Sequence, residues 1–113
     1  SDNTTIDLED GMIHYFTTTE TTTSTPNIRF SSSQTLNNTL TTGDSLTVTV
    51  ITTAAAAGYS ANWQVDGANV TEEWNGGDAP SSANSDGYDV LTHSLTKIGN
   101  ASFLCLSNVS NYA

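Results

Sequence analysis

An Asp-Gly pair at positions 66 and 67, between two runs of alternating apolar and polar residues, constrains the fold of this chain most strongly. A type I′ turn needs a positive φ at both central residues, and Asp-Gly is one of the dipeptides that favour it. The pair therefore predicts an antiparallel hairpin in which Val65 faces Ala68 and Trp63 faces Val70. Because Trp63 lies on the apolar face of this hairpin, we expect it in the core.

Trp74 lies at the far end of the same hairpin face, beside a glycine-rich segment. This position leaves two interpretations open, one in which Trp74 completes the core and one in which it lies on the surface. Aromatic rings near loops can stack on sugars, and Tyr59 and Tyr88 also lie near predicted loops. These three residues are the candidates for glycan contact, against the alternative that they complete a small core.

Five further runs have the alternation or composition of short strands: residues 12–18, 27–30, 45–53, 88–96 and 101–109. The Gly99-Asn100 pair predicts the turn between the last two. The other segments are interpreted as an extended connection (17–26), a loop with at most one helical turn (31–44), a turn or buried corner (54–59) and a long loop (75–87).

No segment has the length or period of an amphipathic helix. The pattern predicts one all-β domain over residues 1–113, an antiparallel β-sandwich of the jelly-roll or immunoglobulin-like type with little or no helix. Residues 1–10 are interpreted as an extended N-terminal arm of this domain.

The chain carries 12 acidic residues and only two basic ones, Arg29 and Lys97, so its formal net charge is −10. Charged residues make up only 12% of it, and the polarity comes mainly from Thr, Ser and Asn. Nucleic acid and anionic membranes are not expected as partners, because both require clustered Lys and Arg. No signal peptide or transmembrane segment is recognisable. This composition is typical of extracellular, cell-surface or virion β-proteins.

No nucleophile elbow, P-loop or dinucleotide fingerprint is present, so we expect neither an enzyme nor a cofactor. His14 and His93 lie on predicted strands, where a structural role is favoured over metal binding or acid–base chemistry. Cys105 is the only cysteine, which rules out an intrachain disulfide and predicts a buried side chain. A Cys105–His93 dyad is disfavoured because nothing in the sequence activates the thiol.

Three carboxylates, Asp78, Asp86 and Asp89, lie close together among Asn and Ser residues. Ca²⁺ prefers such oxygen ligands, and this cluster is the candidate calcium site. The spacing of an EF-hand is missing, and the favoured alternative is that these residues stabilise Asx-turns.

Two long stretches, "HYFTTTETTTSTPNIR" and "TTAAAAGYSANWQVDGANVTEEWNGGDAPSS", resemble a domain that recurs at the C-terminal ends of tail-fibre-like structural proteins of marine tailed phages, especially cyanobacterial ones. With "SDGYDV" and "ASFLCLSNVSNYA", the resemblance covers about residues 8–113, and "VDG…VTEEW.GG.AP" is its most specific part. The run "LTHSLTKIG" departs from the more apolar and aromatic run of the family, so the resemblance does not predict burial of the His93 face.

The resemblance implies a non-enzymatic virion structural module at the virion surface, on a tail fibre or as a capsid decoration. It further implies a homo-oligomer, with a trimer favoured, and contacts with other capsid or tail proteins. It assigns no binding residues. The alternatives are a carbohydrate- or receptor-binding tip that contacts a host surface glycan, and a bacterial surface adhesin or filament subunit.

Overall fold

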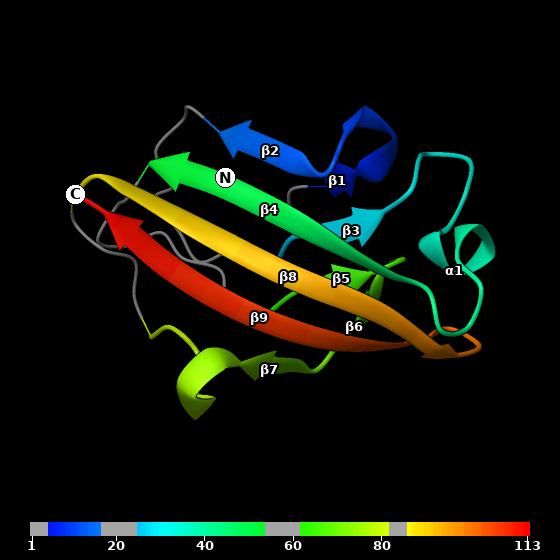
Figure 1. The fold of residues 1–113 in the computed structure, drawn as a ribbon. Helices are drawn as coiled ribbons and strands as arrows, with labels where there is room; N and C mark the ends of the chain where they lie inside the picture. The colour runs from blue at the N-terminus through cyan, green and yellow to red at the C-terminus, as the bar shows by residue number, and fades with distance from the viewer. Residues whose placement is uncertain (1–4, 17–24, 54–61, 82–85) are drawn as a thin grey trace.

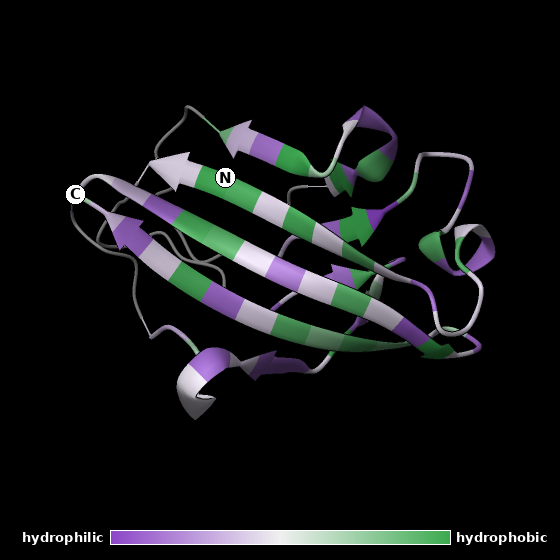
Figure 2. Cartoon of the chain, in the orientation of Figure 1, coloured by the Kyte–Doolittle hydropathy of each residue, from purple (hydrophilic) through white to green (hydrophobic). Residues whose placement is uncertain are grey.

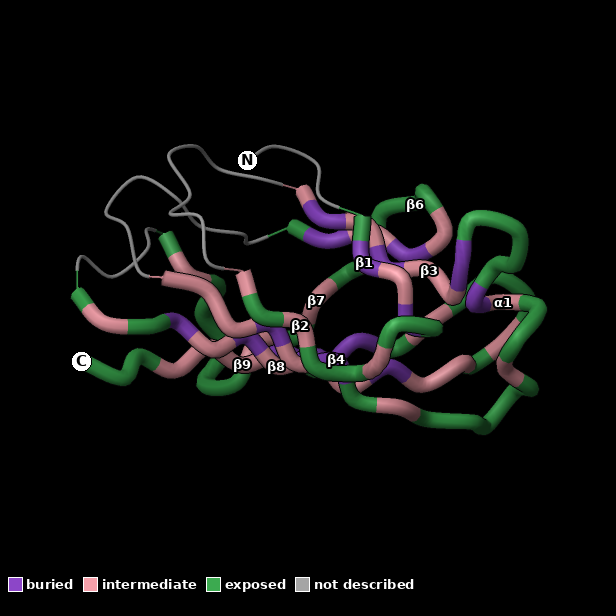
Figure 3. Tube along the Cα trace, turned by 90° about the horizontal axis from the view of Figure 1, so that it is seen from above, coloured by how far each residue is buried: buried purple, intermediate pink, exposed green. Residues whose placement is uncertain are grey.

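Two β-sheets lie face to face in a computed structural model of the chain, as two perpendicular views show (Figures 1 and 3). The structure describes residues 5–16, 25–53, 62–81 and 86–113. Predictions for the other residues lie outside the described part, including those for Tyr59, for the corner at 54–59 and for most of the connection at 17–26. The described residues form mostly strands and one short α-helix, which confirms a mostly β protein.

The larger sheet has five strands in the order β2-β4-β8-β9-β7. β8 runs antiparallel to both β4 and β9, whereas β2 is parallel to β4 and β7 is parallel to β9. Three long strands therefore form the body of this sheet, and a short strand lies at each edge. The bounds are β2 (Ile13–Phe16), β4 (Ser45–Thr53), β7 (Glu72–Trp74), β8 (Tyr88–Gly99) and β9 (Ser102–Tyr112).

The smaller sheet has four short strands in the order β1-β3-β5-β6. β1 and β3 are parallel, as are β3 and β5, and only β5 and β6 form an antiparallel pair. Its strands are β1 (Thr5–Asp7), β3 (Asn27–Arg29), β5 (Gln64–Val65) and β6 (Ala68–Asn69). The described helical turns are the 3-10 helices η1 (Leu8–Asp10) and η2 (Asn75–Gly77) and the α-helix α1 (Leu36–Thr39).

Because both sheets are mixed, the prediction of a purely antiparallel sandwich is wrong. Along the chain, β1, β2, β3 and β4 alternate between the two sheets, so each strand lies beside one that is not its sequence neighbour. A crossover joins such strands, and a crossover allows parallel pairing where a hairpin does not. Jelly-roll and immunoglobulin-like sandwiches are built from antiparallel strands, so neither type describes this chain.

The hairpin at residues 66 and 67 has the predicted register, with Val65 opposite Ala68. The φ angles of the two turn residues are +53° and +81°, as a type I′ turn requires. The N–H of Val70 donates to the carbonyl of Trp63 at 3.2 Å, which confirms the predicted Trp63–Val70 pair. Beyond Val70 the prediction is wrong, because the chain leaves the hairpin and β7 joins the edge of the larger sheet.

The long strands follow their predicted segments closely. β4 has the predicted bounds, and its inward residues Val48 and Val50 are buried. β8 and β9 each continue three residues beyond their predicted ends. The turn between them lies at Asn100 and Ala101, one residue later than predicted, because Gly99 still pairs with Ser102.

The hydrophobic core lies between the two sheets. Figure 2 shows apolar and polar residues alternating along most of β4, and an unbroken apolar run near the start of β9. Ile6 and Leu8 are buried in this core, so residues 5–10 belong to the body of the domain and do not form the predicted arm. The buried hydrophobic residues are Ile6, Leu8, Ile28, Leu36, Val48, Val50, Trp63, Val65, Leu91, Leu95 and Cys105.

Charged side chains from distant segments bind both ends of α1. The carboxylate of Asp66 accepts hydrogen bonds from the backbone N–H groups of Leu36 at 2.7 Å and Asn37 at 2.9 Å. Lys97 Nζ donates to the carbonyls of Asn37 at 2.7 Å and Leu40 at 3.0 Å. A negative group at the N-terminus and a positive group at the C-terminus both oppose the helix dipole, so these contacts stabilise a helix too short to be stable alone. No helix in the described part of the chain has the length and apolar character needed to cross a membrane.

Candidate functional site

The imidazole of His93, in the middle of β8, is buried between the two sheets and contacts both tryptophans. Its side chain is 0% exposed. Its ring centre lies 4.1 Å from that of Trp63, just before β5, and 5.9 Å from that of Trp74, at the end of β7. Trp63 is 1% exposed, which confirms its predicted place in the core, whereas Trp74 is half-buried. The two tryptophans around the Asp-Gly turn thus contact one histidine from different sheets.

Ser107 and Cys105 on β9 complete the surroundings of His93. Ser107 is paired with His93 across the sheet, and its Oγ lies 2.7 Å from His93 Nδ1. Cys105 Sγ lies 3.3 Å from the same hydroxyl and 3.8 Å from His93 Nδ1. The other ring nitrogen, Nε2, is buried and has no hydrogen-bond partner among the described residues.

Cys105 and His93 are therefore neighbours, but their chemistry opposes a nucleophilic pair. Burial lowers the pKa of His93 to about 4 and raises the pKa of the Cys105 thiol. Both shifts favour the uncharged thiol and the uncharged imidazole, whereas the nucleophile of such a pair is the thiolate. Cys105 is 0% exposed, which confirms its predicted burial.

Glu72 links β7 to the segment before β5. Its carboxylate accepts a hydrogen bond from the backbone N–H of Trp63, and Glu72 is paired with Cys105 in the parallel β7–β9 ladder. Partial burial raises the pKa of Glu72, and the hydrogen bond from Trp63 opposes this shift. This polar contact between the two sheets involves Trp63 and lies beside Cys105, and both of these residues contact His93.

A surface groove of about 520 Å³ lies beside Trp74 at the β7 edge of the larger sheet. Its lining residues are Glu73, Trp74, Asn75, Gly76, Thr92, Leu106, Ser107 and Asn108. The amides of Asn75 and Asn108 lie 3.4 Å apart, next to the indole. An apolar wall with a few polar groups beside it is the usual chemistry of a small-ligand site. Trp74 thus lines a surface groove and also packs on the buried His93. Its position is therefore partly that of a core residue and partly that of a surface residue, the two interpretations that the sequence left open.

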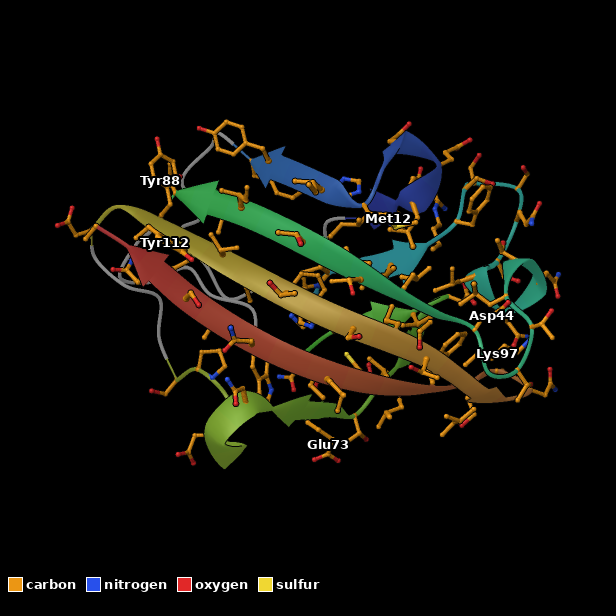
Figure 4. The ribbon with its side chains drawn as sticks, viewed as in Figure 1. Met12, Asp44, Glu73, Tyr88, Lys97 and Tyr112 are labelled. Carbon is orange, nitrogen blue, oxygen red and sulfur yellow. The ribbon has the colours of Figure 1, made fainter. Side chains whose placement is uncertain are left out.

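Tyr88, the other candidate glycan residue in the described part of the chain, does not join Trp74 in this groove. On β9, Trp74 pairs with Ser107 and Tyr88 pairs with Tyr112, five residues further along. At about 3.3 Å per residue, this spacing separates the two sites by roughly 17 Å. Tyr88 instead contacts Tyr15, with ring centres 6.3 Å apart. Figure 4 shows Tyr88 and Tyr112 at one end of the sheet, away from Glu73 on β7.

The three carboxylates of the candidate calcium site have different surroundings. Asp89 is 5% exposed, and its Oδ1 accepts a hydrogen bond from the Asn111 amide at 3.2 Å. Asp78 and Asp86 are exposed. Among the described residues, no group of three or more His, Cys, Asp or Glu side chains is arranged to hold a metal ion. The structure therefore gives the calcium hypothesis no support.

His14, the other histidine considered from the sequence, makes a local contact. Its Nε2 donates to the Gly11 carbonyl at 2.7 Å, within one turn of the chain.

A second groove, of about 350 Å³, lies between the hairpin turn and α1 and is lined by polar residues. Its two charged side chains are Arg29 and Asp66. Arg29 Nε donates to Asp7 Oδ1 at 2.5 Å, which lowers the pKa of Asp7, and Asp66 binds the N-terminus of α1. Because both charges are already paired within the chain, this groove offers little attraction to a charged ligand.

The side of the larger sheet that points away from the smaller one, here called the outer face, is almost free of charge. Paired residues on neighbouring strands point to the same side, so every second cross-strand row lies on the outer face. Among the described residues of these rows, only Glu73, at the β7 edge, is charged. The outer face consists of Ile13, Tyr15, Ser45, Thr47, Thr49, Ile51, Thr53, Glu73, Tyr88, Val90, Thr92, Ser94, Thr96, Leu104, Leu106, Asn108, Ser110 and Tyr112.

Sequence reasoning missed this face, and it missed the contacts of two acidic residues. The signal for the face was present, since Ile13, Tyr15, Leu104 and Leu106 alternate with core positions on their strands. Glu72 was also visible as an acidic residue on an apolar strand face. Nothing in the local sequence connects the Asp66 turn with the start of α1, thirty positions away.

A comparison of the chain with protein-family models, with curated proteins and with solved structures finds no match in any of the three.

Proposed function

We propose that this chain is a non-enzymatic structural module at the surface of a tailed-phage particle, on a tail fibre or as a capsid decoration. It acts by surface contact with copies of itself and with other capsid or tail proteins. The observation that carries the proposal is the outer face, a broad side with one charged residue in a chain of net charge −10. Large apolar side chains exposed on one face, such as Ile13, Tyr15 and Leu106, support a role for that face in contacts with other proteins. The resemblance to tail-fibre-like domains supports a location on the particle.

The chemistry of the buried groups supports a non-enzymatic role. The most reactive side chains, His93 and Cys105, are buried, and their pKa shifts favour the uncharged forms. Both fixed cations are bound within the chain, Arg29 by Asp7 and Lys97 by the carbonyls at the end of α1. This arrangement supports the exclusion of nucleic acid and of anionic membranes as partners, because phosphate binding depends on available Lys and Arg.

The location is tested by immunogold labelling of a lysate from cells that carry the gene. Antibody raised against the purified domain should label gradient-purified phage particles on the tail or the capsid surface. Label confined to the cell envelope would support the adhesin or filament alternative and contradict the proposal, and so would label confined to soluble protein.

A second candidate function, recognition of a host surface glycan, is favoured by one observation, the groove beside Trp74. It combines an indole, two amides and the Glu73 carboxylate, groups that can stack on a sugar ring and bind its hydroxyls. The groove is shallow and its binding residues come from one edge of the sheet. A glycan would therefore bind at the edge of the larger sheet formed by β7, beside η2.

Glycan-array screening tests this second function. Wild-type protein should bind a restricted set of glycans, and both Trp74→Ala and Asn75→Ala should reduce the signal. The matched control is Asn69→Ala, which removes an exposed amide from β6 in the other sheet. Since Trp74 also packs on His93, far-ultraviolet circular dichroism must show that each variant is folded. Absence of binding by the wild type would eliminate this function.

A further inference from the structure

We infer that the outer face of the larger sheet is the surface by which two copies of this chain pack face to face. This inference rests on the proposed function, and it names the contact through which the module associates with itself. The partner at this face is then a second copy of the chain, and the resulting assembly is a closed homodimer.

The charge distribution favours a second copy at this face. Each chain has a net charge of −10, so two copies repel each other, and the repulsion at contact is weakest when they approach by a side that lacks carboxylates. The outer face is such a side in the described part of the chain, where Glu73 at the β7 edge is its one charged residue. Figure 4 shows Glu73 below the sheet, at the rim of this face. A central area without charged residues is also the usual anatomy of a protein interface.

The chemistry of the exposed side chains favours packing against a like surface. Ile13 is 68% exposed, Tyr15 55%, Leu106 51% and Tyr112 64%. Between these apolar groups lie rows of Thr and Ser, such as the Ser45–Thr96 hydroxyl pair across β4 and β8. Hydroxyls of this kind can bond to one another across an interface, as donors and as acceptors, so the same row can pair with its own copy. Each sheet keeps its backbone hydrogen bonds within itself, and only side chains need to meet.

The size of the face is sufficient for a specific contact. The strand lengths, with a spacing of about 4.8 Å between strands and about 3.3 Å per residue, give a projected area of about 600 Å². Specific interfaces bury roughly 600–1,000 Å² on each partner. A second copy must therefore cover most of the face, which leaves no equivalent area for a third copy. By this argument the assembly is a two-fold pair, in contrast to the trimer that the resemblance to fibre domains implies.

Sedimentation equilibrium of the purified chain tests the inference. Wild-type protein should have a mass of two chains, and both Ile13→Lys and Leu104→Lys should weaken the pair at least about tenfold in Kd, because each places a charge without a charged cross-strand neighbour in the contact. The matched control, Ala68→Lys, adds the same charge at an exposed position in the smaller sheet and should leave the pair intact. Thermal unfolding must show that all three variants are folded.

Added salt provides a second measure of the same contact. Because the paired faces lack charge while the two chains repel each other, NaCl should screen the repulsion and strengthen the pair. A wild-type mass of one chain or of three chains would overturn the inference, as would equal weakening by Ala68→Lys.

The proposed location on the particle is tested separately by the gold label. If the label is on the particle but the purified chain is a monomer, another virion protein covers the face and only the inference of a pair fails. Pairing would also cover Thr92, Leu106 and Asn108 of the groove beside Trp74. Glycan binding that leaves the two-chain mass unchanged at saturation would therefore contradict this mode of packing.

Discussion

The ring centre of His93 lies 4.1 Å from that of Trp63, so the central strand of the larger sheet contacts the smaller sheet through a titratable ring. Both side chains are almost fully buried. Burial lowers the pKa of His93 to about 4, and the imidazole is therefore uncharged at neutral pH. Packing between the sheets is thus linked to the protonation state of one side chain.

We expect the free energy of unfolding to fall as the pH is lowered from 6.5 to about 4. In this window the unfolded chain binds a proton at His93 and the folded chain does not, so protonation favours the unfolded state. The difference in pKa corresponds to a loss of about 3 kcal/mol across the window. Urea unfolding at a series of pH values measures this loss.

The control for the pH effect is His93→Gln, which removes the titrating ring. The raised pKa of Glu72 has the opposite effect on the free energy of unfolding, because the folded state binds a proton at Glu72 more readily than the unfolded state does. Glu72 therefore offsets part of the loss of stability at the acid end of the window. Glu72 is present in both proteins, so its contribution cancels in their difference. Equal pH slopes in the wild type and the variant would show that His93 is not the group responsible.

Asp66→Asn should destabilise the protein by about 1 kcal/mol without disrupting the hairpin. Asn-Gly also favours a type I′ turn, but an amide has one oxygen and no charge with which to bind the N–H groups of Leu36 and Asn37. Chemical unfolding measures the difference. The exposed carboxylate of Asp10 provides the comparison, since Asp10→Asn removes the same charge without this contact. A similar loss in both variants would contradict the role given to Asp66.

Cys105 should react with a thiol-specific dye only as fast as the protein unfolds. The side chain is 0% exposed, and burial raises the pKa of its thiol, so the folded state offers neither access nor thiolate. Complete reaction is expected in denaturant. Ser102→Cys, which adds a thiol at an exposed position, should give one rapidly labelled thiol per chain. Rapid labelling of the wild type under native conditions would mean that Cys105 is accessible.

Trp63→Ala should cost about 3–5 kcal/mol in the free energy of unfolding, because it leaves a large cavity between the sheets. Trp74→Ala should cost clearly less, since Trp74 is half-buried and part of its ring already contacts solvent. Urea unfolding of the two variants at neutral pH compares them directly. Equal losses would mean that both indoles are packed to the same extent.

Local pattern was sufficient to predict several elements of the fold. The period-two alternation of residues 45–53 correctly predicted both the bounds of β4 and the face of it that is buried. The turn at Asp66 and Gly67 gave the register of β5 and β6, because a type I′ turn is a property of two adjacent residues. Burial of Trp63 and Cys105 followed from their strand positions. These features depend on backbone geometry within a few residues, and that information is contained in a short segment.

The arrangement of the strands depends on contacts between residues far apart in the chain. The parallel pairs β1–β3 and β2–β4 arise because the chain crosses between sheets after each strand, and several pairings would bury the same faces equally well. The same crossings carry β7 away from its hairpin, so that Trp74 contacts His93 from the larger sheet and Trp63 contacts it from the segment before β5. Hydrophobic alternation specifies that a face is buried but not which strand covers it, and the long-range packing of the folded chain supplies that choice.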